Sequence, residues 1–471
     1  MFSLLLSAAL ALALAPESLE VGGELKDMTD RHLTGMAMKM LETRAREVAA
    51  SRSKPEVLRR QEHIRARVLA ALGGFPERTP LNARVTGVLE RSDYRVEKLI
   101  FESQPDFPVT ASVFVPTGPA PPWPAVLGVA GHSNNGKASE PYQRVWISLA
   151  KRGILVIAWD PPGQGERSEY IDRATGKTLV GIGTTQHTMA GLQCLLTGTN
   201  FARYELWDGV RAFDYLLTRK DVDPKRIGVA GNSGGGTQSA YLAVVEPRLA
   251  AAAPSCYITS WEKLWIEPGP QDAEQVFVDF LSDGLKFSDF LISVAPRPMQ
   301  MATAFRDLFP MDGARAAYAE AKRIFEVMDA PGRAGYFEFD DTHGWTKPRR
   351  EATYRWFEKW LKGRDDEGLE PEFEIEKDEA LLATSTGQVA TSMKAETVFT
   401  LNRALAERLH AARAAAKGGD VRQLLARRLR LERPGARPPA AAARGVVQRE
   451  GYRIEKVALE PERGITLPAL V

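Results

Sequence analysis

A serine flanked by glycines is the strongest candidate for chemistry in this chain. Ser233 lies in Gly231-Asn-Ser-Gly-Gly235, between a short apolar run at residues 227–230 and a helix-like run at 237–245. Strand, G-x-S-x-G and helix in this order are typical of a nucleophile elbow. Glycines two positions either side of the serine remove side chains that would collide in so sharp a turn. We therefore predict that Ser233 is a nucleophile and that the N–H of Gly234, at the helix start, binds an oxyanion.

The order of residues along the chain selects the general base. In elbow hydrolases the acid and then the histidine follow the serine, and of the six histidines only His343 and His410 lie beyond Ser233. His410 lies in an arginine-rich helical stretch. His343 follows a predicted strand at residues 335–339, where the base is expected, so we predict that it accepts the serine proton.

The acid should follow the preceding predicted strand, at residues 299–305. Asp307 is just past that strand and is the predicted acid, with Asp340 and Asp341 as alternatives. A buried carboxylate at this place would hold the imidazole of His343 in the correct tautomer and stabilise its charged form.

The loop after the third predicted strand should supply the second oxyanion donor. It reads Gly131-His-Ser-Asn-Asn-Gly-Lys137. We assign the role to Ser133, with His132 or Asn134 as alternatives.

Four further side chains are predicted substrate contacts, each with a structural alternative. His132 could instead be structural, and His187 could cap the segment that follows it. Gln164 belongs to a rigid glycine-rich loop at residues 160–167, which we expect to shape the pocket rather than to react. Trp261 opens a lid-like insertion at residues 261–295, and a tryptophan there could stack on a sugar or simply pack. The four predicted contacts are His132, Gln164, His187 and Trp261.

The elements that must position these residues are apolar runs separated, later in the chain, by helical segments. Two alternating strands are followed by continuous apolar runs, as in strands buried on both faces. This order predicts an α/β fold, a mostly parallel eight-stranded sheet with helices on both faces, and the serine after the fifth strand is the layout of the α/β-hydrolase fold. The predicted strands are residues 95–102, 109–115, 124–130, 153–159, 227–230, 249–254, 299–305 and 335–339.

Composition excludes several classes of protein and site. The net charge of +2 gives no electrostatic footprint for nucleic acid. Two cysteines, Cys194 and Cys256, exclude a disulfide scaffold and a cysteine-rich zinc site. We expect free buried thiols, although a pair stays open, and we expect no metal site and no cofactor.

The ends of the chain differ from its middle. Residues 1–15 are apolar, too short to span a bilayer and end in a small-x-small pattern, so we predict a signal peptide and a secreted or periplasmic protein; a misplaced start or an N-terminal anchor is the alternative. No other stretch could form a stable membrane span. The predicted parts are a helical segment at 16–80, the catalytic domain at 81–363, an acidic then helical connector at 364–420, and a C-terminal appendage at 421–471.

Several motifs together resemble one family over about residues 80–363. They are similar to those of the acetylxylan esterases and related α/β-hydrolases, and of carbohydrate deacetylases with a Gly-Gln-Gly loop. The resemblance implies a secreted carboxylic-ester hydrolase that acts on acetylated sugars without a metal. The elbow here is Gly231-Asn-Ser-Gly-Gly235, whereas the deacetylases are expected to have Gly-Gly-Ser-Gln-Gly. The resemblance therefore supports the fold more strongly than it supports the substrate. The motifs are Gly131-His-Ser133 with Gly136-Lys137, Pro162-Gly-Gln-Gly165, Val222-Asp-Pro-Lys-Arg-Ile-Gly228, Gly231-Asn-Ser-Gly-Gly-Gly236 and Asp341-Thr-His-Gly-Trp345.

The C-terminal appendage repeats the start of the catalytic domain. Residues 434–460 match residues 76–102 at eleven of 27 positions without a gap, far more than unrelated segments would share. We interpret residues 421–471 as the first strands of a second, incomplete hydrolase-like repeat, and a truncated reading of a tandem chain is the hypothesis that this suggests.

These observations predict a serine esterase with the triad Ser233, His343 and Asp307 that acts on a small-molecule or polysaccharide ester. A serine peptidase of the prolyl-oligopeptidase type is one alternative, although residues 16–80 leave no room for its β-propeller. A non-catalytic carbohydrate-binding protein with a relic triad is the other. Oligomeric state is not predicted.

Overall fold

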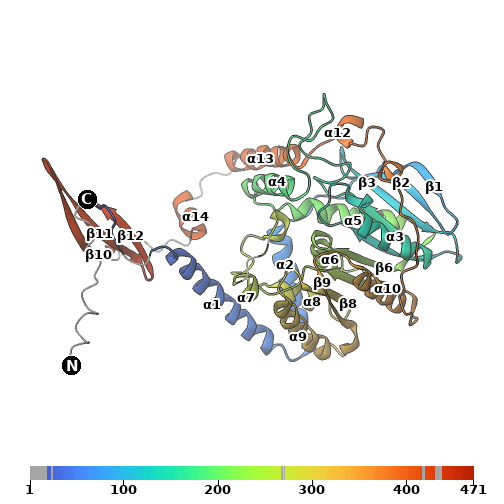
Figure 1. The fold of residues 1–471 in the computed structure, drawn as a ribbon, viewed down its shortest axis with the longest axis horizontal. Coiled ribbons are helices and arrows are strands. Elements are labelled where there is room, and N and C mark those ends of the chain that lie inside the picture. Colours follow the sequence, from blue (N-terminus) through green and yellow to red (C-terminus); the bar gives the residue numbers. More distant parts are fainter. Residues whose placement is uncertain (1–17, 23–24, 267–268, 270, 416–419, 430–437) are drawn as a thin grey trace. The chain divides into compact units, whose positions relative to one another are not determined.

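The protein forms two compact units in a computed structural model (Figure 1). One unit is Thr43–Arg413, and the other combines Met1–Glu42 with Ala414–Val471. The structure describes residues 18–22, 25–266, 269, 271–415, 420–429 and 438–471. The predicted signal peptide, residues 1–15, lies outside the described residues.

A nine-stranded sheet runs through the larger unit in the order β1-β2-β3-β5-β4-β6-β7-β8-β9. The pairs from β1 to β5 are antiparallel, and those from β5 to β9 are parallel. This confirms the predicted mostly parallel sheet. The strands are β1 Arg84–Glu90, β2 Tyr94–Gln104, β3 Phe107–Pro116, β4 Trp123–Val129, β5 Leu155–Trp159, β6 Val222–Asn232, β7 Ala251–Ser255, β8 Met299–Arg306 and β9 Ala334–Thr342.

The prediction of eight strands is wrong by one, because it missed β1. The side chains of β1 are mostly exposed, so the strand shows no clear apolar alternation. Its backbone pairing with β2 holds it at the edge of the sheet. A strand fixed by backbone pairing rather than by burial leaves little hydrophobic signal in the sequence.

Helices accompany the sheet along the chain. They are α1 Met28–Ala50, α2 Lys54–Ala71, α3 Glu140–Lys151, α4 Thr184–Leu196, α5 Ala202–Thr218, α6 Gly234–Val245, α7 Trp261–Leu264, α8 Phe287–Ile292, α9 Met311–Val327, α10 Lys347–Lys362, α11 Asp378–Leu381, α12 Val389–Ser392, α13 Val398–Ala415 and α14 Val421–Arg428, with 3-10 turns η1 Gly136–Ala138, η2 Ala273–Gln275 and η3 Pro331–Arg333. None of the described helices is both long and apolar enough to cross a membrane.

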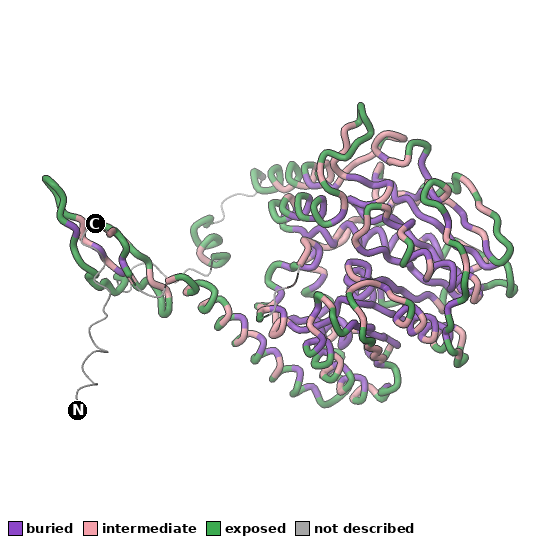
Figure 2. The backbone as a smooth tube through the Cα atoms, in the orientation of Figure 1, coloured by how far each residue is buried: buried purple, intermediate pink, exposed green. Residues whose placement is uncertain are grey.

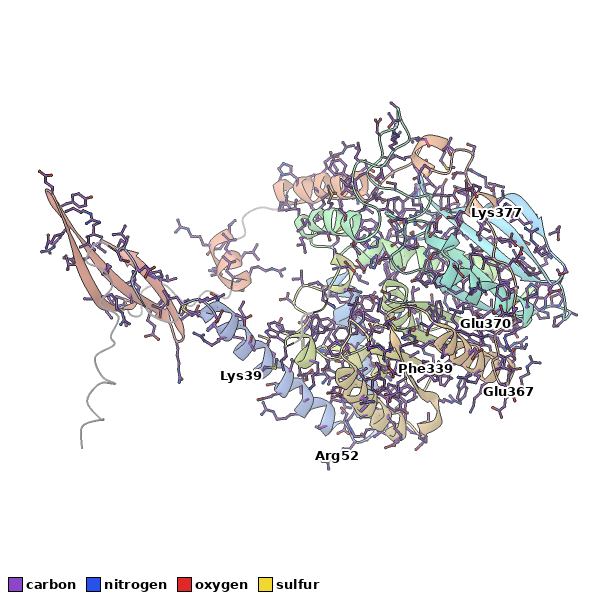
Figure 3. All side chains as sticks on the ribbon, in the orientation of Figure 1. Lys39, Arg52, Phe339, Glu367, Glu370 and Lys377 are labelled. Carbon is purple, nitrogen blue, oxygen red and sulfur yellow. The ribbon has the colours of Figure 1, made fainter. Side chains whose placement is uncertain are left out.

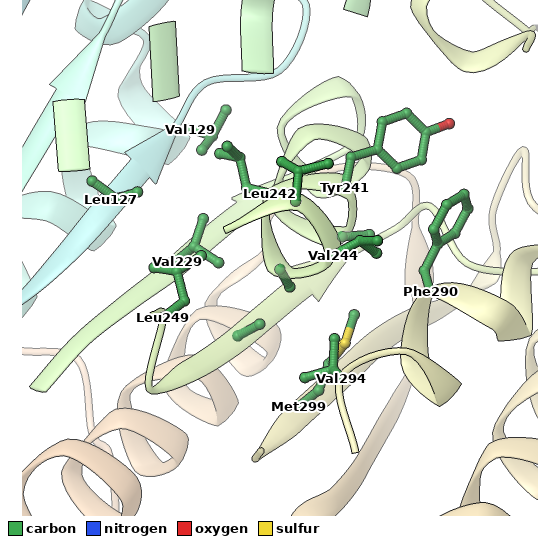
Figure 4. Packing of buried hydrophobic residues seen from close by; sticks show 14 of the residues in the cluster. Leu127, Val129, Val229, Tyr241, Leu242, Val244, Leu249, Phe290, Val294 and Met299 are labelled. Atoms are coloured by element: carbon green, nitrogen blue, oxygen red, sulfur yellow. The ribbon is translucent and has the colours of Figure 1, made fainter. Parts of the chain in front are cut away.

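The central strands are buried on both faces because helices cover both. All seven residues of β4 are buried. Leu127 and Val129 pack with residues of α5, α6, α8 and α9, whereas Val126 packs on the other face with α3 and α10. Figure 4 shows part of the first cluster, with Val129 near Leu242 of α6. The central strands therefore form a fixed platform, and Figure 2 colours most of their residues as buried.

The larger unit takes in more of the chain than the predicted domain at 81–363. Arg44 of α1 is 1% exposed and donates to Asp289 of α8 at 2.9 Å. Glu370, which is labelled in Figure 3, lies beyond α10. Its carboxylate accepts from Arg350 at 2.5 Å and from the Tyr354 hydroxyl at 2.7 Å. Parts of the predicted N-terminal segment and of the connector thus pack against α8 and α10 through buried polar contacts.

The C-terminal appendage forms a separate three-stranded sheet, β10-β11-β12, made of Ala440–Arg449, Tyr452–Glu462 and Ile465–Leu470. Its pairing repeats that of β1-β2-β3. Gly87 pairs with Lys98 and Gly445 with Lys456, each next to a bulge. The repeat seen in the sequence is therefore also a repeat of strand register, including the irregularity.

Candidate active site

Ser233 occupies a strained turn between β6 and α6. Its φ of 58° and ψ of −124° lie in a region that residues with a side chain rarely adopt. A Cβ on Gly231 would lie 2.4 Å from the carbonyl oxygen of Gly235, and one on Gly235 would lie 2.2 Å from the carbonyl oxygen of Val129. Backbone atoms thus leave no room for a Cβ at either position, so both must be glycine, as the sequence predicts.

Three predicted residues meet at the carboxyl ends of the strands. Nε2 of His343 lies 2.8 Å from Oγ of Ser233. Nδ1 of the same ring lies 2.7 Å from Oδ1 of Asp307. Because β6, β8 and β9 run parallel, the loops that follow them reach the same edge of the sheet. The arrangement can pass the hydroxyl proton of Ser233 to an imidazole that is oriented by a carboxylate.

Asp307 is the buried member of this group. Its side chain is 1% exposed, whereas that of His343 is 26% exposed. Burial alone would raise the pKa of Asp307, but hydrogen bonds from His343, the Cys256 thiol and the Phe309 N–H outweigh it and hold that pKa below its ordinary value. Asp307 is therefore held as a carboxylate, the form that can pair with a charged imidazole.

The alternative acids have other partners. Asp340 is exposed and pairs with Arg306. Asp341 lies 3.1 Å from Arg349, which is fully buried. Neither carboxylate is the one that contacts Nδ1 of His343, so the geometry selects Asp307 from the three predicted candidates.

The predicted oxyanion residues lie on two loops. Gly234 begins α6 directly after Ser233, and a Cβ on it would lie 2.9 Å from Cε1 of His132. The loop after β4 therefore reaches the residue that follows Ser233. Oγ of Ser133 donates to the carbonyl of Gly136 at 3.3 Å, which turns the hydroxyl into the loop. The role of the Ser133 N–H in binding an oxyanion stays a prediction.

A buried ion cluster holds that loop in place. Nζ of Lys137 lies 2.6 Å from Asp160 and 2.7 Å from Glu166. Glu166 also accepts the N–H of Ala383 at 2.8 Å. The loops after β4 and β5 are thus tied together and to the segment before α12, in line with the expectation that the second loop shapes the pocket rather than reacts.

The other predicted substrate contacts have different surroundings. Gln164 is buried, and its side-chain amide donates to the carbonyl of Gly131 at 3.0 Å, so it braces the loop that carries His132. Trp261 packs against Phe280 and Phe287 in an aromatic cluster. Packing, the structural alternative for Trp261, is what its contacts show.

His132 and His187 come together with acidic side chains that the sequence analysis gave no role. Nε2 of His132 lies 3.1 Å from Nδ1 of His187. Glu274 of η2 contacts both rings, and Glu205 of α5 lies 3.9 Å from His187. No motif identifies Glu205, because it is a single acid within a helix and only the packing of α5 brings it here.

Both cysteines are free and buried.

Comparisons with known proteins agree with this architecture. The sequence profile of the acetyl xylan esterase family (AXE1) matches residues 82–281, a range that contains Ser233 but neither Asp307 nor His343. YtaP of Bacillus subtilis (strain 168), a protein named as a hydrolase, is 24% identical over 310 residues, which are 63% of this chain and 98% of YtaP.

Solved structures give the same result for the fold. Methylesterase BT1017 superposes with a TM-score of 0.61 at 21% identity, over 80% of this chain and 81% of that chain. A protein from Bacteroides fragilis NCTC 9343, described as an acetyl xylan esterase, gives a TM-score of 0.51 at 19% identity, over 61% and 76% of the two chains. The predicted α/β-hydrolase fold is confirmed. The profile match also confirms the predicted resemblance to the acetyl xylan esterases, and the enzyme class of the chain is carboxylic ester hydrolase.

Proposed function

We propose that this enzyme removes acetyl groups from acetylated carbohydrate with a triad of Ser233, His343 and Asp307. The observation that carries the proposal is the continuous chain of contacts from Oγ of Ser233 through the imidazole to the buried carboxylate, at 2.8 and 2.7 Å. The match to the acetyl xylan esterase profile supports the choice of acetyl ester.

The mechanism follows from these positions. Nε2 of His343 takes the proton of Ser233 as Oγ attacks the ester carbonyl. The N–H of Gly234 and a second donor near Ser133 bind the developing oxyanion. His343 then gives the proton to the leaving alcohol, and water attacks the acyl-enzyme by the same route. Asp307 stays ionised and stabilises the imidazolium that forms between the two transfers.

The test compares the wild type with Ser233→Ala on p-nitrophenyl acetate and on acetylated xylan. We expect acetate release from both substrates by the wild type and its loss in the variant. Release of methanol from a methyl-esterified polysaccharide, without acetate from xylan, would instead indicate a methylesterase. Wild-type turnover that survives Ser233→Ala would contradict the assignment of the nucleophile.

We also propose that the enzyme is exported. The apolar residues 1–15 and their small-x-small end support this. Cell fractionation of the full-length chain, with N-terminal sequencing of the mature protein, tests it; cytoplasmic protein that begins at Met1 would contradict it.

A further inference from the structure

A second cluster of reactive side chains lies beside Gly234 and has no part in the proposed triad. His132 comes from the loop after β4, His187 from α4 and Glu274 from η2. Cε1 of His132 would lie 2.9 Å from a Cβ on Gly234. Three segments that are distant in the sequence thus bring two imidazoles and a carboxylate to one point next to Ser233.

The two imidazoles and the carboxylate lie at nearly equal separations from one another. Nε2 of His132 lies 3.1 Å from Nδ1 of His187 and 3.1 Å from Oε1 of Glu274. Nδ1 of His187 lies 3.2 Å from Oε2 of Glu274. Ligands bound tetrahedrally to Zn²⁺ at about 2.0 Å are about 3.3 Å apart. The separation of the two nitrogens and each nitrogen–oxygen separation are close to this value, with a different oxygen of Glu274 facing each ring.

The opposite nitrogen of each ring faces an acceptor. Nε2 of His187 lies 2.9 Å from the carbonyl oxygen of Pro162, to which it can only donate. Nδ1 of His132 lies 3.5 Å from Oδ2 of Asp272. Because Nε2 of His187 faces a carbonyl, its Nδ1 is the ring atom that is presented to Nε2 of His132 and to Glu274. Backbone carbonyls and carboxylates behind metal-binding histidines orient them in this way.

The carboxylates of the cluster are under-satisfied. Glu274 is 1% exposed, and its Oε1 accepts no hydrogen bond of normal geometry from any described residue despite the nearby imidazole. Glu205 is fully buried, and its Oε2 has no hydrogen-bond partner among the described residues. Buried polar atoms without partners call for a specific explanation, and a bound ion is one. A divalent cation would satisfy the converging lone pairs and balance the acidic charge.

We propose that His132, His187 and Glu274 form a binding site for a divalent transition-metal ion of the zinc type. Two imidazoles and a carboxylate are a donor set that Zn²⁺ takes at sites with an open position. Asp272 faces the opposite nitrogen of His132, Nδ1, at 3.5 Å. The side chains of His132 and Asp272 are 17% exposed, which gives the ion a route from solvent. The inference goes beyond the proposed function and differs from the sequence, which led us to expect no metal.

Metal content of the untagged, full-length protein is the first measurement. The wild type is dialysed against a chelator, its fold is checked by circular dichroism, and Zn²⁺ or Co²⁺ is added back before desalting. We expect about one ion per chain, and for Co²⁺ the intense visible absorption of a tetrahedral site. A folded wild type that retains neither ion would overturn the proposal and leave a proton-bridged histidine–carboxylate cluster in its place.

Three variants and a matched control assign the site. His187→Ala and Glu274→Gln should lose binding, and Asp272→Asn should weaken it by about 10- to 100-fold because it removes only the carboxylate behind His132. His410→Ala, an exposed histidine on α13, should bind as the wild type does. If the two buried variants do not fold, Asp272→Asn decides on its own. Affinity in a folded Asp272→Asn variant within twofold of the wild type would overturn the assignment.

Discussion

Asp307→Asn is the most informative change to the proposed mechanism. The asparagine keeps the size of the side chain, and its oxygen can still accept from Nδ1 of His343, which is 2.7 Å from Asp307 in the wild type. What the variant loses is the negative charge beside the imidazolium. The wild-type carboxylate is 1% exposed, so water screens this charge poorly.

The expected loss follows from the separation of the charges. Two unit charges about 3.5 Å apart in a medium of effective dielectric constant about 20 attract by about 5 kcal/mol. If that attraction exists only while His343 is charged, its loss lowers kcat by about 10³- to 10⁴-fold. The fold should persist, since the shape of the side chain is unchanged.

The assay is steady-state hydrolysis of p-nitrophenyl acetate at pH 8, with circular dichroism to confirm the fold. Asp340→Asn is the matched control, because Asp340 is an exposed carboxylate on the same segment as His343, and its kcat should stay within about twofold of the wild type. Asp341→Asn should lower stability through the buried Arg349 rather than kcat. A folded Asp307→Asn variant that keeps more than a tenth of wild-type kcat would refute the reasoning, above all if Asp341→Asn lost it instead.

Three further changes test the elbow, the packing and the pH dependence of stability. Gly235→Ala places a Cβ 2.2 Å from a backbone oxygen of β4 and should abolish soluble folded enzyme. The control Gly332→Ala adds a Cβ with no atom within 4 Å, so its expression level and melting temperature should match those of the wild type. Two variants that express and melt alike would contradict the steric clash at Gly235. Asp289→Asn removes the carboxylate charge that two buried arginines, Arg44 and Arg60, contact at 2.9 and 2.8 Å, and it should lower the free energy of unfolding by about 3–5 kcal/mol in urea titrations. A loss under about 1 kcal/mol would show that Glu320, the other partner of Arg44, suffices. Burial raises the pKa of Glu169 from 4.5 to about 7, so the folded state binds this proton more tightly than the unfolded state does. The free energy of unfolding of the wild type therefore falls as pH rises between those two values. Relative to wild type, Glu169→Gln should therefore gain about 2–4 kcal/mol between pH 4.5 and pH 8, and parallel pH profiles of the two proteins would count against this.

Much of the fold could be predicted because the central strands are buried, and buried strands consist of apolar residues that are recognisable in the sequence. The apolar runs of β4 and β5 are continuous since helices cover both faces of each strand. β1 could not be predicted in this way, because its backbone pairs with β2 while its side chains face solvent. The extent of the larger unit could not be predicted from the sequence either, because contacts such as that of Arg44 with Asp289 join residues 245 positions apart.

For the site, the sequence by itself determined the residues whose roles depend on local geometry or on chain order. The elbow around Ser233 is a local conformation that only its glycines permit, and the scarcity of histidines left His343 as the base. Chain order favoured Asp307 and left Asp340 and Asp341 as alternatives. The tertiary structure decided among the three, because Asp307 is the carboxylate that lies 2.7 Å from Nδ1 of His343.

Tertiary structure also decided the cluster beside Gly234. His132, His187, Glu205 and Glu274 lie on four segments with no common spacing. Their convergence depends on how α4, α5 and η2 pack over the loop after β4. Periodicity and local motifs depend only on residues that are near one another along the chain. A site assembled from distant segments is recognised when the fold brings the two imidazoles to 3.1 Å from each other and to within 3.2 Å of the Glu274 carboxylate.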